Sequence, residues 1–384
     1  MGKLKKMSPL WKDAFGCTLF TCAIAGLFYL LFVNISFLDP FEKAFKDFSY
    51  TDLYYSKLQP KSGINSDIIL VNAQHEDRFA IAQAISIIAS EKPKAIGLDL
   101  IFKDLKVSFT DSILKAELEK HDNLVKAYFE TDSGTVESHS YFKSDNENLG
   151  YINLDQEEAG VIREFVGIDK GANSFAVQLA KTAGYLKNDK DTKVLEASLP
   201  INYTRNDEGF LTVSISELLE NQGFPAAQDA IVIFGYLGTP EGNRFDIEDK
   251  HFTPLNPKFA GKSVPDMFGV TVHANILNMI VKDGFIKRVP NFVTWILTLL
   301  GCLLCSYIGL RLHRKSEFLF DLLPKIFQFI LAILLVYIGL LFIKSSIYIN
   351  ISIILLMCLL TFEMVEFYLY LKHYLIKRRV WRIS

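Results

Sequence analysis

Long runs without charged residues are the most conspicuous pattern in the chain. Four such runs occupy residues 14–38, 289–310, 326–343 and 345–362. A helix that crosses the ~30 Å hydrocarbon core of a bilayer needs about 20 apolar residues, with roughly 17 as the lower limit. The runs therefore predict four transmembrane helices, the fourth spanning 345–369. Lys344, which separates the last two runs, is expected in a tight turn of a helical hairpin.

Between residues 39 and 288, short apolar runs alternate with helical patterns. Strands are predicted at 67–72, 95–102, 124–128, 199–203 and 230–235. Helices are predicted at 78–90, 111–121, 174–183, 214–220 and 269–281, and the polar segment 130–148 is predicted to be a loop or mobile insertion. The strands are continuously apolar and most are followed by a helix. This pattern predicts an α/β domain with a largely parallel sheet flanked by helices on both faces.

Charge is divided unevenly along the chain. The chain holds 41 Lys+Arg and 43 Asp+Glu residues, a formal net charge of −2, and is 50% apolar. These values exclude a generally basic nucleic-acid binder and a mostly disordered protein. Residues 39–288 carry a net charge of −11, whereas both apolar ends carry an excess of basic residues. An acidic middle between basic, apolar ends is typical of a membrane protein.

The basic residues also predict an orientation. They cluster before the first apolar run, after the second and after the fourth. Cytoplasmic loops carry an excess of Lys and Arg. We therefore predict a protein of the inner membrane with a cytoplasmic N-terminus (1–13), a cytoplasmic loop (311–325), a cytoplasmic basic tail (370–384) and an extracytoplasmic domain (39–288).

A cleaved signal peptide is the alternative for the N-terminus. The tripeptide Ala23-Ile24-Ala25 resembles a cleavage site. The apolar run continues through 26–38, however, which is longer than a signal core needs. An uncleaved membrane anchor is therefore favoured.

All five cysteines fall inside the apolar runs. Residues 39–288 contain none, so no disulfide framework is expected there. Cys302 and Cys305 have the spacing of a redox motif, but thiols in hydrocarbon remain protonated and inert. We interpret both as packing residues.

Motifs of enzymes are missing from the sequence. It contains no Gly-x-Ser-x-Gly and no His-Glu-x-x-His pattern. Gly261-Lys262-Ser263 imitates the end of a phosphate-binding loop, but Asn256 stands where the loop needs a glycine. We therefore expect no enzyme activity, no catalytic residues and no cofactor.

Asp99 is the first candidate for a ligand contact. It lies inside the apolar segment AIGLDLIF, where an unpaired carboxylate is costly. It could lie at the carboxyl end of a parallel strand, where open α/β sheets bind ligands. The alternative is a structural Asp that accepts backbone N–H bonds in the next turn.

Two further candidates follow in the second half of the domain. The segment 246–254 holds Asp249, His251 and Thr253, whose oxygen and imidazole groups could hold a divalent cation. A solvated acidic loop without metal is the simpler interpretation. His273 and Asn275 lie in the predicted helix 269–281, where a hydrogen-bonded core histidine is the alternative to a ligand contact.

Two carboxylates occur near the end of the fourth predicted span. Glu363 and Glu366 could mark a helix contact or a relay. Snorkelling of both side chains to the membrane interface is the simpler account.

Eight segments, in order along the chain, carry a family resemblance. They are 68–74 (IILVNAQ), 94–102 (KAIGLDLIF), 150–165, 174–181, 199–220, 229–238, 249–256 (DKHFTPLN) and 268–281 (FGVTVHANILNMIV). The region resembles the CHASE2 domain, an extracytoplasmic sensory module of bacterial adenylate cyclases, histidine kinases, diguanylate cyclases and serine/threonine kinases. One span before the domain and three after it is also the arrangement typical of that family. Because the chain ends at Ser384, about 15 residues beyond the fourth span, we expect a stand-alone member without a cytoplasmic effector domain.

The resemblance implies a sensory function. We expect a polytopic membrane protein that binds an unknown extracytoplasmic ligand and signals to a separate partner. The alternative is a structural or assembly protein that docks on another envelope protein. The membrane bilayer is an expected partner, and nucleic acid is not. The ligand site is expected at the sheet edge that holds Asp99, Asp249, His251, Thr253, His273 and Asn275.

Overall fold

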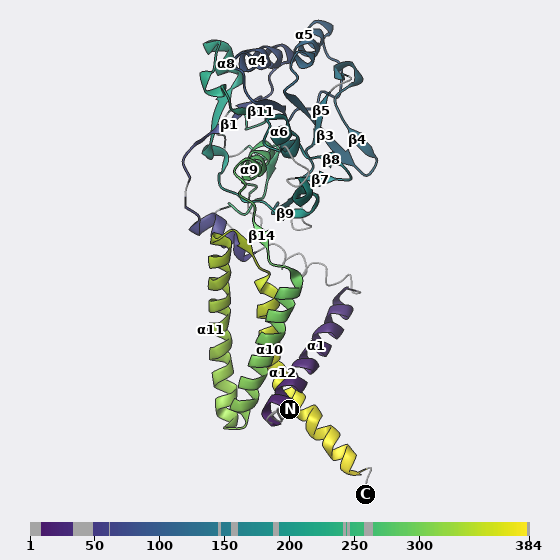
Figure 1. The fold of residues 1–384 in the computed structure, drawn as a ribbon, viewed down its shortest axis with the longest axis vertical. Helices are drawn as coiled ribbons and strands as arrows, with labels where there is room; N and C mark the ends of the chain where they lie inside the picture. Colours follow the sequence, from purple (N-terminus) through teal and green to yellow (C-terminus); the bar gives the residue numbers. More distant parts are fainter. Residues whose placement is uncertain are drawn as a thin grey trace, which may run out of the picture. The chain divides into compact units, whose positions relative to one another are not determined.

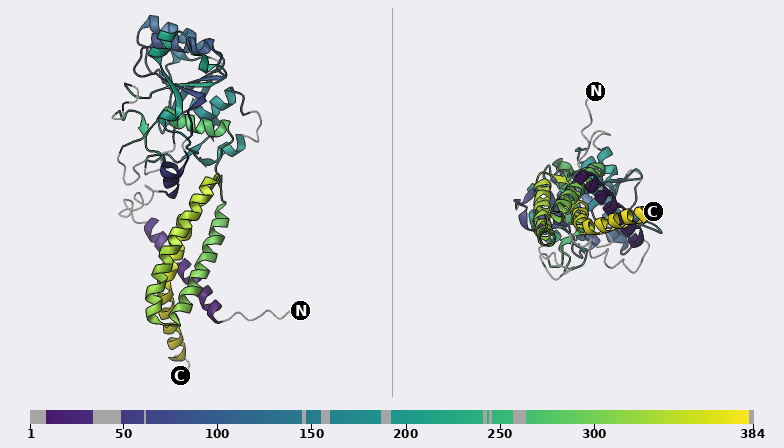
Figure 2. Two further views of the ribbon diagram at one scale, coloured as in Figure 1. Left: turned by 90° about the vertical axis from the view of Figure 1, so that its left-hand side faces the viewer. Right: turned by 90° about the horizontal axis from the view of Figure 1, so that it is seen from below.

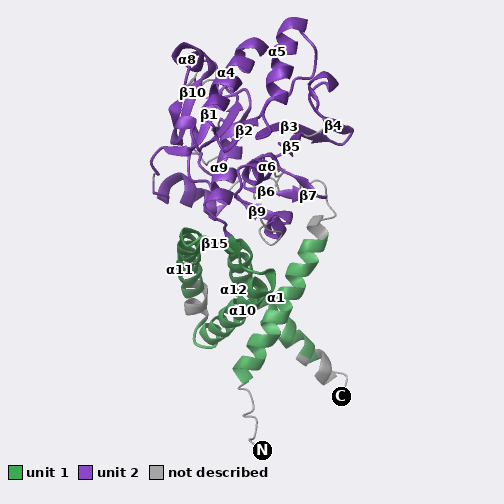
Figure 3. Ribbon diagram, turned by 45° about the horizontal axis from the view of Figure 1, so that its top comes forward, with its two compact units in different colours: residues 1–43, 287–384 green, residues 44–286 purple. Residues whose placement is uncertain are grey.

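The chain forms two compact units, which are coloured separately in Figure 3. The computed structural model describes residues 9–33, 49–60, 62–144, 147–154, 160–186, 192–240, 243, 246–256 and 264–381. One unit comprises residues 1–43 and 287–384, and it contains the long apolar helices. The other comprises residues 44–286 and contains the α/β domain.

A seven-stranded sheet forms the centre of the α/β domain (Figure 1). Its strands are β1 (Asn65–Asn72), β2 (Ala95–Leu98), β3 (Leu124–Thr131), β4 (Gly134–Val136), β5 (Asn148–Tyr151), β10 (Phe210–Ser214) and β11 (Ile231–Gly235). The strand order is β10-β1-β11-β2-β3-β4, and β5 also pairs with β3. Only the β3–β4 hairpin is antiparallel. The predicted largely parallel sheet is therefore confirmed.

Helices cover both faces of this sheet (Figures 1 and 2). One face carries α4 (Arg78–Ser90), α5 (Ser108–Glu119) and α8 (Ile215–Asn221), which share one hydrophobic core with the strands. The other face carries α6 (Phe175–Thr182) and α9 (Gly269–Val281). Local signals fix the helix starts: Asp77 caps α4 by accepting a hydrogen bond from the N–H of Ala80 at 2.8 Å. Ser214 and Glu217 form a capping box at the start of α8.

Close packing on the second face depends on glycine. A Cβ atom at Gly97 would lie 2.8 Å from the ring of Phe175 in α6, and one at Gly235 would lie 2.7 Å from Val270 in α9. Both glycines lie in strands of the main sheet. Their missing side chains let α6 and α9 approach the carboxyl ends of β2 and β11.

Several predicted boundaries in this domain were wrong. The predicted strand 95–102 ends at Leu98, and the predicted loop 130–148 contains β4, a 3-10 turn η3 (Ser140–Phe142) and the first residue of β5. The predicted strand 199–203 is β9 (Ser198–Pro200). It pairs with β6 (Glu164–Val166) outside the main sheet. The edge strand β10 was not predicted, because FLTVS is only partly apolar.

Short elements complete the domain. They are α3 (Tyr50–Leu53), the π-helical turn η2 (Tyr54–Leu58), β7 (Ile168–Asp169), β8 (Ala172–Asn173), η4 (Val194–Glu196), η5 (Asp207–Gly209), η6 (Pro225–Ala227), β12 (Lys250–His251) and β13 (Met267–Phe268). The pairs β7–β8 and β12–β13 are antiparallel.

Four helices of the other unit are long and apolar enough to cross a membrane. They are α1 (Pro9–Val33), α10 (Asn291–His313), α11 (Glu317–Lys344) and α12 (Ile351–Trp381). The last three contact one another and run side by side (Figures 1 and 2). Residues 34–38 of the first predicted span lie outside the described residues.

The start of the fourth predicted span was placed six residues too early. Residues Ile347–Tyr348 form β15, which pairs in parallel with β14 (Lys287–Arg288). Ser346 adopts a left-handed conformation with φ 57°, so the chain turns there before it pairs. The helix begins only at Ile351, and the predicted tight turn beside Lys344 is confirmed.

Small and polar side chains line the contacts among α1, α10 and α12. The hydroxyls of Thr18 and Ser306 lie 3.1 Å apart, and Cys358 Sγ lies against Gly301. All five cysteines are free, and four of them are buried. Cys302 and Cys305 are among the buried ones, in agreement with their interpretation as packing residues. Glu363 contacts α11 through Lys325 and Gln328. The helix contact considered from the sequence is therefore observed for this carboxylate.

Candidate functional site

The carboxyl ends of the central strands meet at one edge of the main sheet. Asn72, at the end of β1, lies beside Ser214 of β10 and Gly235 of β11. Asn72 Nδ2 donates to the carbonyl of Gly238 at 3.0 Å, and Asn72 Oδ1 accepts from the N–H of Leu237 at 3.0 Å. This amide therefore holds the loop after β11 against the end of β1. Open α/β sheets bind ligands at such an edge, which we call the carboxyl edge.

Asp99 lies at the carboxyl edge, directly after β2. Its N–H donates to the carbonyl of Phe234 at 2.9 Å, which continues the strand pairing. Because side chains alternate along a strand, Asp99 shares the face of Gly97, which α6 covers. Burial, and then the carboxylate of Asp249, raise the pKa of Asp99 to about 8. In the described part of the chain the Asp99 carboxyl accepts no hydrogen bond, so the structural role considered from the sequence is not observed.

Asp249 and His251 lie over the first turn of α9. Asp249 adopts φ 55°, and its carbonyl accepts from the N–H of Gly269 at 3.0 Å. A Cβ atom at Gly269 would lie 3.1 Å from Asp249 Oδ2 and 3.4 Å from His251 Nε2. The missing side chain of Gly269 leaves room for both groups. His251 Nε2 lies 3.9 Å from Asp249 Oδ1.

The local environment shifts the pKa values of Asp249 and His251. Partial burial, followed by the charge of Glu248, raises the pKa of Asp249 to about 6. Burial lowers the pKa of His251. Asp249 therefore carries a proton more readily than an exposed carboxylate does, and His251 carries one less readily than an exposed imidazole does.

Two more acidic residues, Asp207 and Asp266, belong to this region and were not identified from the sequence. Asp207 Oδ1 accepts from the N–H of Phe268, the N-cap of α9, at 3.3 Å, and burial raises the pKa of Asp207 to about 6. Burial also raises the pKa of Asp266 to about 7, despite hydrogen bonds from Thr253. Asp266 precedes the start of α9 by three residues. Acidic residues are common around helix starts, and this was the available signal.

Thr253 and Asn275 are fully engaged within the domain. Thr253 donates to both oxygens of Asp266, from its N–H at 2.8 Å and its hydroxyl at 2.6 Å. The Asn275 amide accepts from the N–H of Thr204 at 3.0 Å and donates to the carbonyl of Arg205 at 2.8 Å. Both side chains support the carboxyl edge, and neither presents a group to a ligand.

His273 is buried in the second turn of α9. Its ring makes an edge-to-face contact with Phe175, with ring centroids 5.7 Å apart. Burial lowers the pKa of His273 to about 3, with a smaller effect of His251, although a backbone hydrogen bond at Ile152 opposes the shift. His273 matches the core histidine considered from the sequence and stays neutral under ordinary conditions.

The acidic segment 246–254 does not assemble a metal site in the described residues. Asp246 instead organises the loop: its Oδ2 accepts from the hydroxyl of Tyr236 at 2.5 Å and from the N–H of Thr239 at 2.9 Å. Among the described residues, no three His, Cys, Asp or Glu side chains come together in a geometry that could hold a metal ion.

Four carboxyl groups with raised pKa therefore surround the carboxyl edge and the start of α9: Asp99, Asp207, Asp249 and Asp266. The fully buried hydroxyl of Thr271, in the first turn of α9, lies beside the Asp207 carboxyl and lowers the pKa of that group, which opposes the larger effect of burial. A positively charged or hydrogen-bond-donating group would interact favourably with these acceptors, because each carboxylate is costly to ionise on its own.

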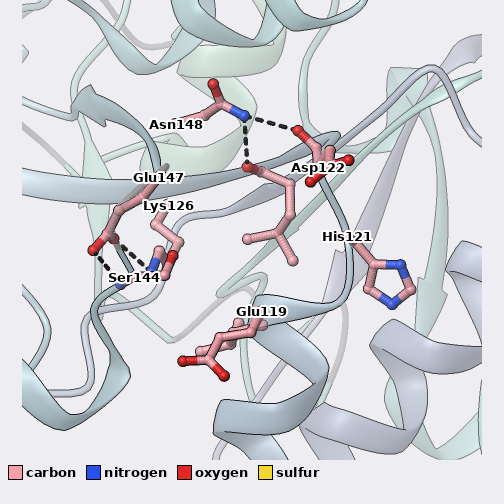
Figure 4. Close-up of a pocket in the computed structure, with 9 residues that line it drawn as sticks. Glu119, His121, Asp122, Lys126, Ser144, Glu147 and Asn148 are labelled. Atoms are coloured by element: carbon pink, nitrogen blue, oxygen red, sulfur yellow. Dashed lines mark hydrogen bonds and ion pairs between the residues drawn. The ribbon is translucent and has the colours of Figure 1, made fainter.

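A cavity of about 280 Å³ lies at the opposite, amino edge of the sheet (Figure 4). Lys126 Nζ pairs with Glu147 at 2.5 Å and donates to the carbonyl of Phe142 at 2.9 Å. Asn148 Nδ2 donates to the carbonyl of Asp122 at 2.9 Å. The buried charges in this cavity thus neutralise each other. The carboxyl edge, with several unneutralised acceptors, is the stronger candidate for a site.

An α/β domain joined to four helices of membrane-spanning length defines a membrane protein that carries a separate folded domain. The family model of the CHASE2 domain matches residues 24–310, which is most of the chain, and the chain belongs to this family. Membership in this sensory family and the apolar helices fit a membrane sensory protein. No curated protein and no solved structure matches the chain.

Proposed function

We propose that this protein is an inner-membrane sensor whose CHASE2 domain binds a ligand outside the cytoplasm and signals to a separate protein. Family membership supports the sensory role. The basic clusters beside the apolar helices support cytoplasmic termini and an extracytoplasmic domain over 39–288. The scarcity of enzyme motifs supports a binding rather than a catalytic function.

The position of the proposed ligand site is argued from Asp99. A carboxyl group with its pKa raised to about 8, at the edge where α/β sheets bind ligands, offers strong acceptors to an incoming group. Asp249 and His251 flank the same helix start. The chemistry favours a ligand that brings positive charge, such as an organic amine, and such a ligand competes with protons for the carboxylates.

The helix α9 provides a route for the signal. It begins at Gly269, beside Asp249, and only five residues of chain separate its end from β14. β14 pairs with β15, which joins α11 to α12, and α10 follows β14 directly. A ligand that binds two arrangements of α9 unequally would shift their populations, whereas equal affinity would shift nothing.

Thermal unfolding of the full-length protein in detergent micelles, measured at pH values between 5 and 9, tests the site. Because the folded-state pKa of Asp99 is raised from 3.8 to about 8, its contribution to stability is fully present below about pH 4. That contribution is lost as the pH rises through 8. Asp99→Asn should therefore flatten the decline in melting temperature toward pH 9. Asp104→Asn, an exposed carboxylate on the same loop, should leave the decline unchanged.

Spermidine, added at pH 8 as a probe of amine binding, gives the second arm. It should raise the melting temperature of the wild type and of Asp104→Asn, and should have no effect on Asp99→Asn. Equal responses of all three proteins to both pH and spermidine would remove the carboxyl edge as the ligand site.

The partner requires a separate experiment. Crosslinking in intact cells followed by mass spectrometry should recover a cytoplasmic kinase or cyclase if the protein is a sensor. The alternative function, docking on another envelope protein, would instead produce a stoichiometric envelope partner and no response to small molecules.

A further inference from the structure

An exposed aromatic pair lies on the α4–α5 side of the CHASE2 domain. Phe79, in the first turn of α4, and Phe109, in the first turn of α5, stack with ring centroids 6.4 Å apart. Their exposed fractions are 36% and 66%, and those of the neighbouring Leu105 and Val107 are 50% and 58%. We call these four residues the aromatic patch. Contiguous apolar patches on a protein surface commonly mark interaction sites.

The patch is built on a rigid support. Arg78 is buried, forms an ion pair with Asp111 and donates to the carbonyl of Asp104. Its guanidinium lies 5.6 Å from the ring centroid of Phe102 and 5.2 Å from that of Phe142. These contacts tie the start of α4 to the loop before α5, so Phe79 and Phe109 are held in place without a partner.

The charges around the patch have a self-complementary arrangement. Glu76 and Asp77 precede Phe79 in the chain, whereas Lys103 and Lys106 precede Phe109. Asp104, between the two lysines, reduces the positive excess on that side without reversing it. In a contact with two-fold symmetry, the Phe79 side of the patch on one copy faces the Phe109 side of the patch on the other copy. Acidic and basic residues would then face each other.

We propose that the aromatic patch is the contact between two copies of this chain. Residues 39–288 carry a net charge of −11, so two domains repel each other over most of their surfaces. Around the aromatic patch the acidic and basic residues nearly balance, and two copies can approach each other there. A phenylalanine side chain has a surface of ~200 Å². At their exposed fractions, Phe79 and Phe109 therefore offer about 200 Å² of aromatic surface together. A stable interface needs ~800 Å² per partner, so the contact is weak in solution and depends on the membrane helices, which concentrate the copies in one bilayer.

Cysteine crosslinking of the full-length protein in membranes tests the contact. All native cysteines lie in α1, α10 and α12, so a single cysteine in the CHASE2 domain reports on that domain alone. Val107→Cys replaces a valine of the patch. Val194→Cys replaces a valine that is similarly exposed, at 50% against 58% for Val107, but lies outside the patch. With a short, water-soluble bis-maleimide, Val107→Cys should yield a dimer at least five-fold more efficiently than Val194→Cys or the wild type.

Second-site changes separate a specific contact from random collision. Adding Phe109→Asp to Val107→Cys should abolish the dimer band, whereas adding Phe129→Asp, at a 41% exposed phenylalanine outside the patch, should preserve it. Lys106→Glu should weaken the dimer, and Glu76→Lys in the same chain should restore it. Equal crosslinking at positions 107 and 194, no effect of Phe109→Asp, or a crosslink from position 107 to a different protein would each overturn the proposal.

Discussion

Asp13 in α1 forms an ion pair with Lys372 in α12, although 359 positions separate them in the chain. The other oxygen of the same carboxylate accepts from the guanidinium of Arg314, after α10, at 2.9 Å. Asp13 is the only acidic residue among the first 38. One carboxylate thus joins three helices at the end where the basic residues cluster, and the sequence pattern alone assigned this end only a positive charge.

Replacing Asp13 should therefore loosen α1 from α10 and α12. Asp13→Asn leaves two cations without their counter-charge, and partly exposed ion pairs are worth up to about 1 kcal/mol each. We expect a lower melting temperature in detergent at low salt, and a smaller difference in 0.5 M salt. Lys12→Ala, at the exposed neighbouring position, is the control. Equal stability of Asp13→Asn and the wild type at low salt would show that the ion pairs contribute nothing.

The packing of α6 against β5 leads to a sharper prediction. A Cβ atom at Gly150 would lie 2.5 Å from the Cα atom of Phe175, and a backbone atom cannot move aside as a side chain can. Gly150→Ala should cost about 1–3 kcal/mol of folding free energy, the usual range for overpacking. Gly63→Ala, where the added methyl group meets nothing within 4 Å, should be nearly neutral. Chemical denaturation of the two variants measures the difference, and equal midpoints would contradict the expected overpacking.

The fold was largely predictable because its central elements carry strong local signals. The predicted helices 78–90 and 269–281 coincide with α4 and α9, since each is a long amphipathic or apolar stretch with a clear start. β5 and β10 escaped prediction because pairing partners distant in the chain define them. β10 gains its place beside β1 through pairs such as Val71 with Val213, and no local pattern specifies such a pair.

The site was predictable only in part. Asp99 stood out because a carboxylate in an apolar strand is costly, and the structure places it at the carboxyl edge near Asp249. Asp207 and Asp266 were missed because their burial depends on how three separate segments fold around the start of α9. Asn275 looked like a ligand contact in sequence, but its amide holds the backbone of residues 204–205. A polar residue in an apolar helix can serve either role, and only tertiary contacts distinguish them.

Burial of His273 predicts instability in acid. Its folded-state pKa is lowered from 6.5 to about 3, so its contribution to stability is present above pH 6.5 and is lost as the pH falls toward 3. Each unit corresponds to about 1.4 kcal/mol. The carboxyl groups at the carboxyl edge act in the opposite direction, because their raised pKa values favour the folded state as the pH falls toward 4. The effect of His273 is therefore measured as a difference between the wild type and a His273 variant, because the carboxyl groups contribute equally to both.

Variants at histidine test the acid side of this profile. His273→Gln should be less stable than the wild type at pH 7, because it loses the contact with Phe175, but this difference in stability should shrink between pH 6 and pH 4. His75→Gln, at an exposed histidine, should follow the wild type at both values. Parallel profiles for all three proteins would show that His273 does not control acid stability.

β14 lies where the chain passes from the α/β domain to α10, and it pairs with β15. The N–H of Lys287 donates to the carbonyl of Ser346, and that of Val289 to the carbonyl of Tyr348, each at 2.9 Å. Ser346 has φ 57°, a value that proline cannot adopt and that glycine adopts without cost. Ser346→Pro should therefore break the pair, and Ser346→Gly should preserve it.

Hydrogen exchange followed by mass spectrometry measures both local and long-range consequences. In Ser346→Pro the amides of Lys287 and Val289 should exchange at least ten-fold faster than in the wild type. If α9 transmits the signal through this pair, spermidine added at pH 8 should change exchange at the start of α12 in the wild type and in Ser346→Gly, but not in Ser346→Pro. A response that persists in Ser346→Pro would mean that the signal reaches α12 by another route, because the pair would then be broken without consequence.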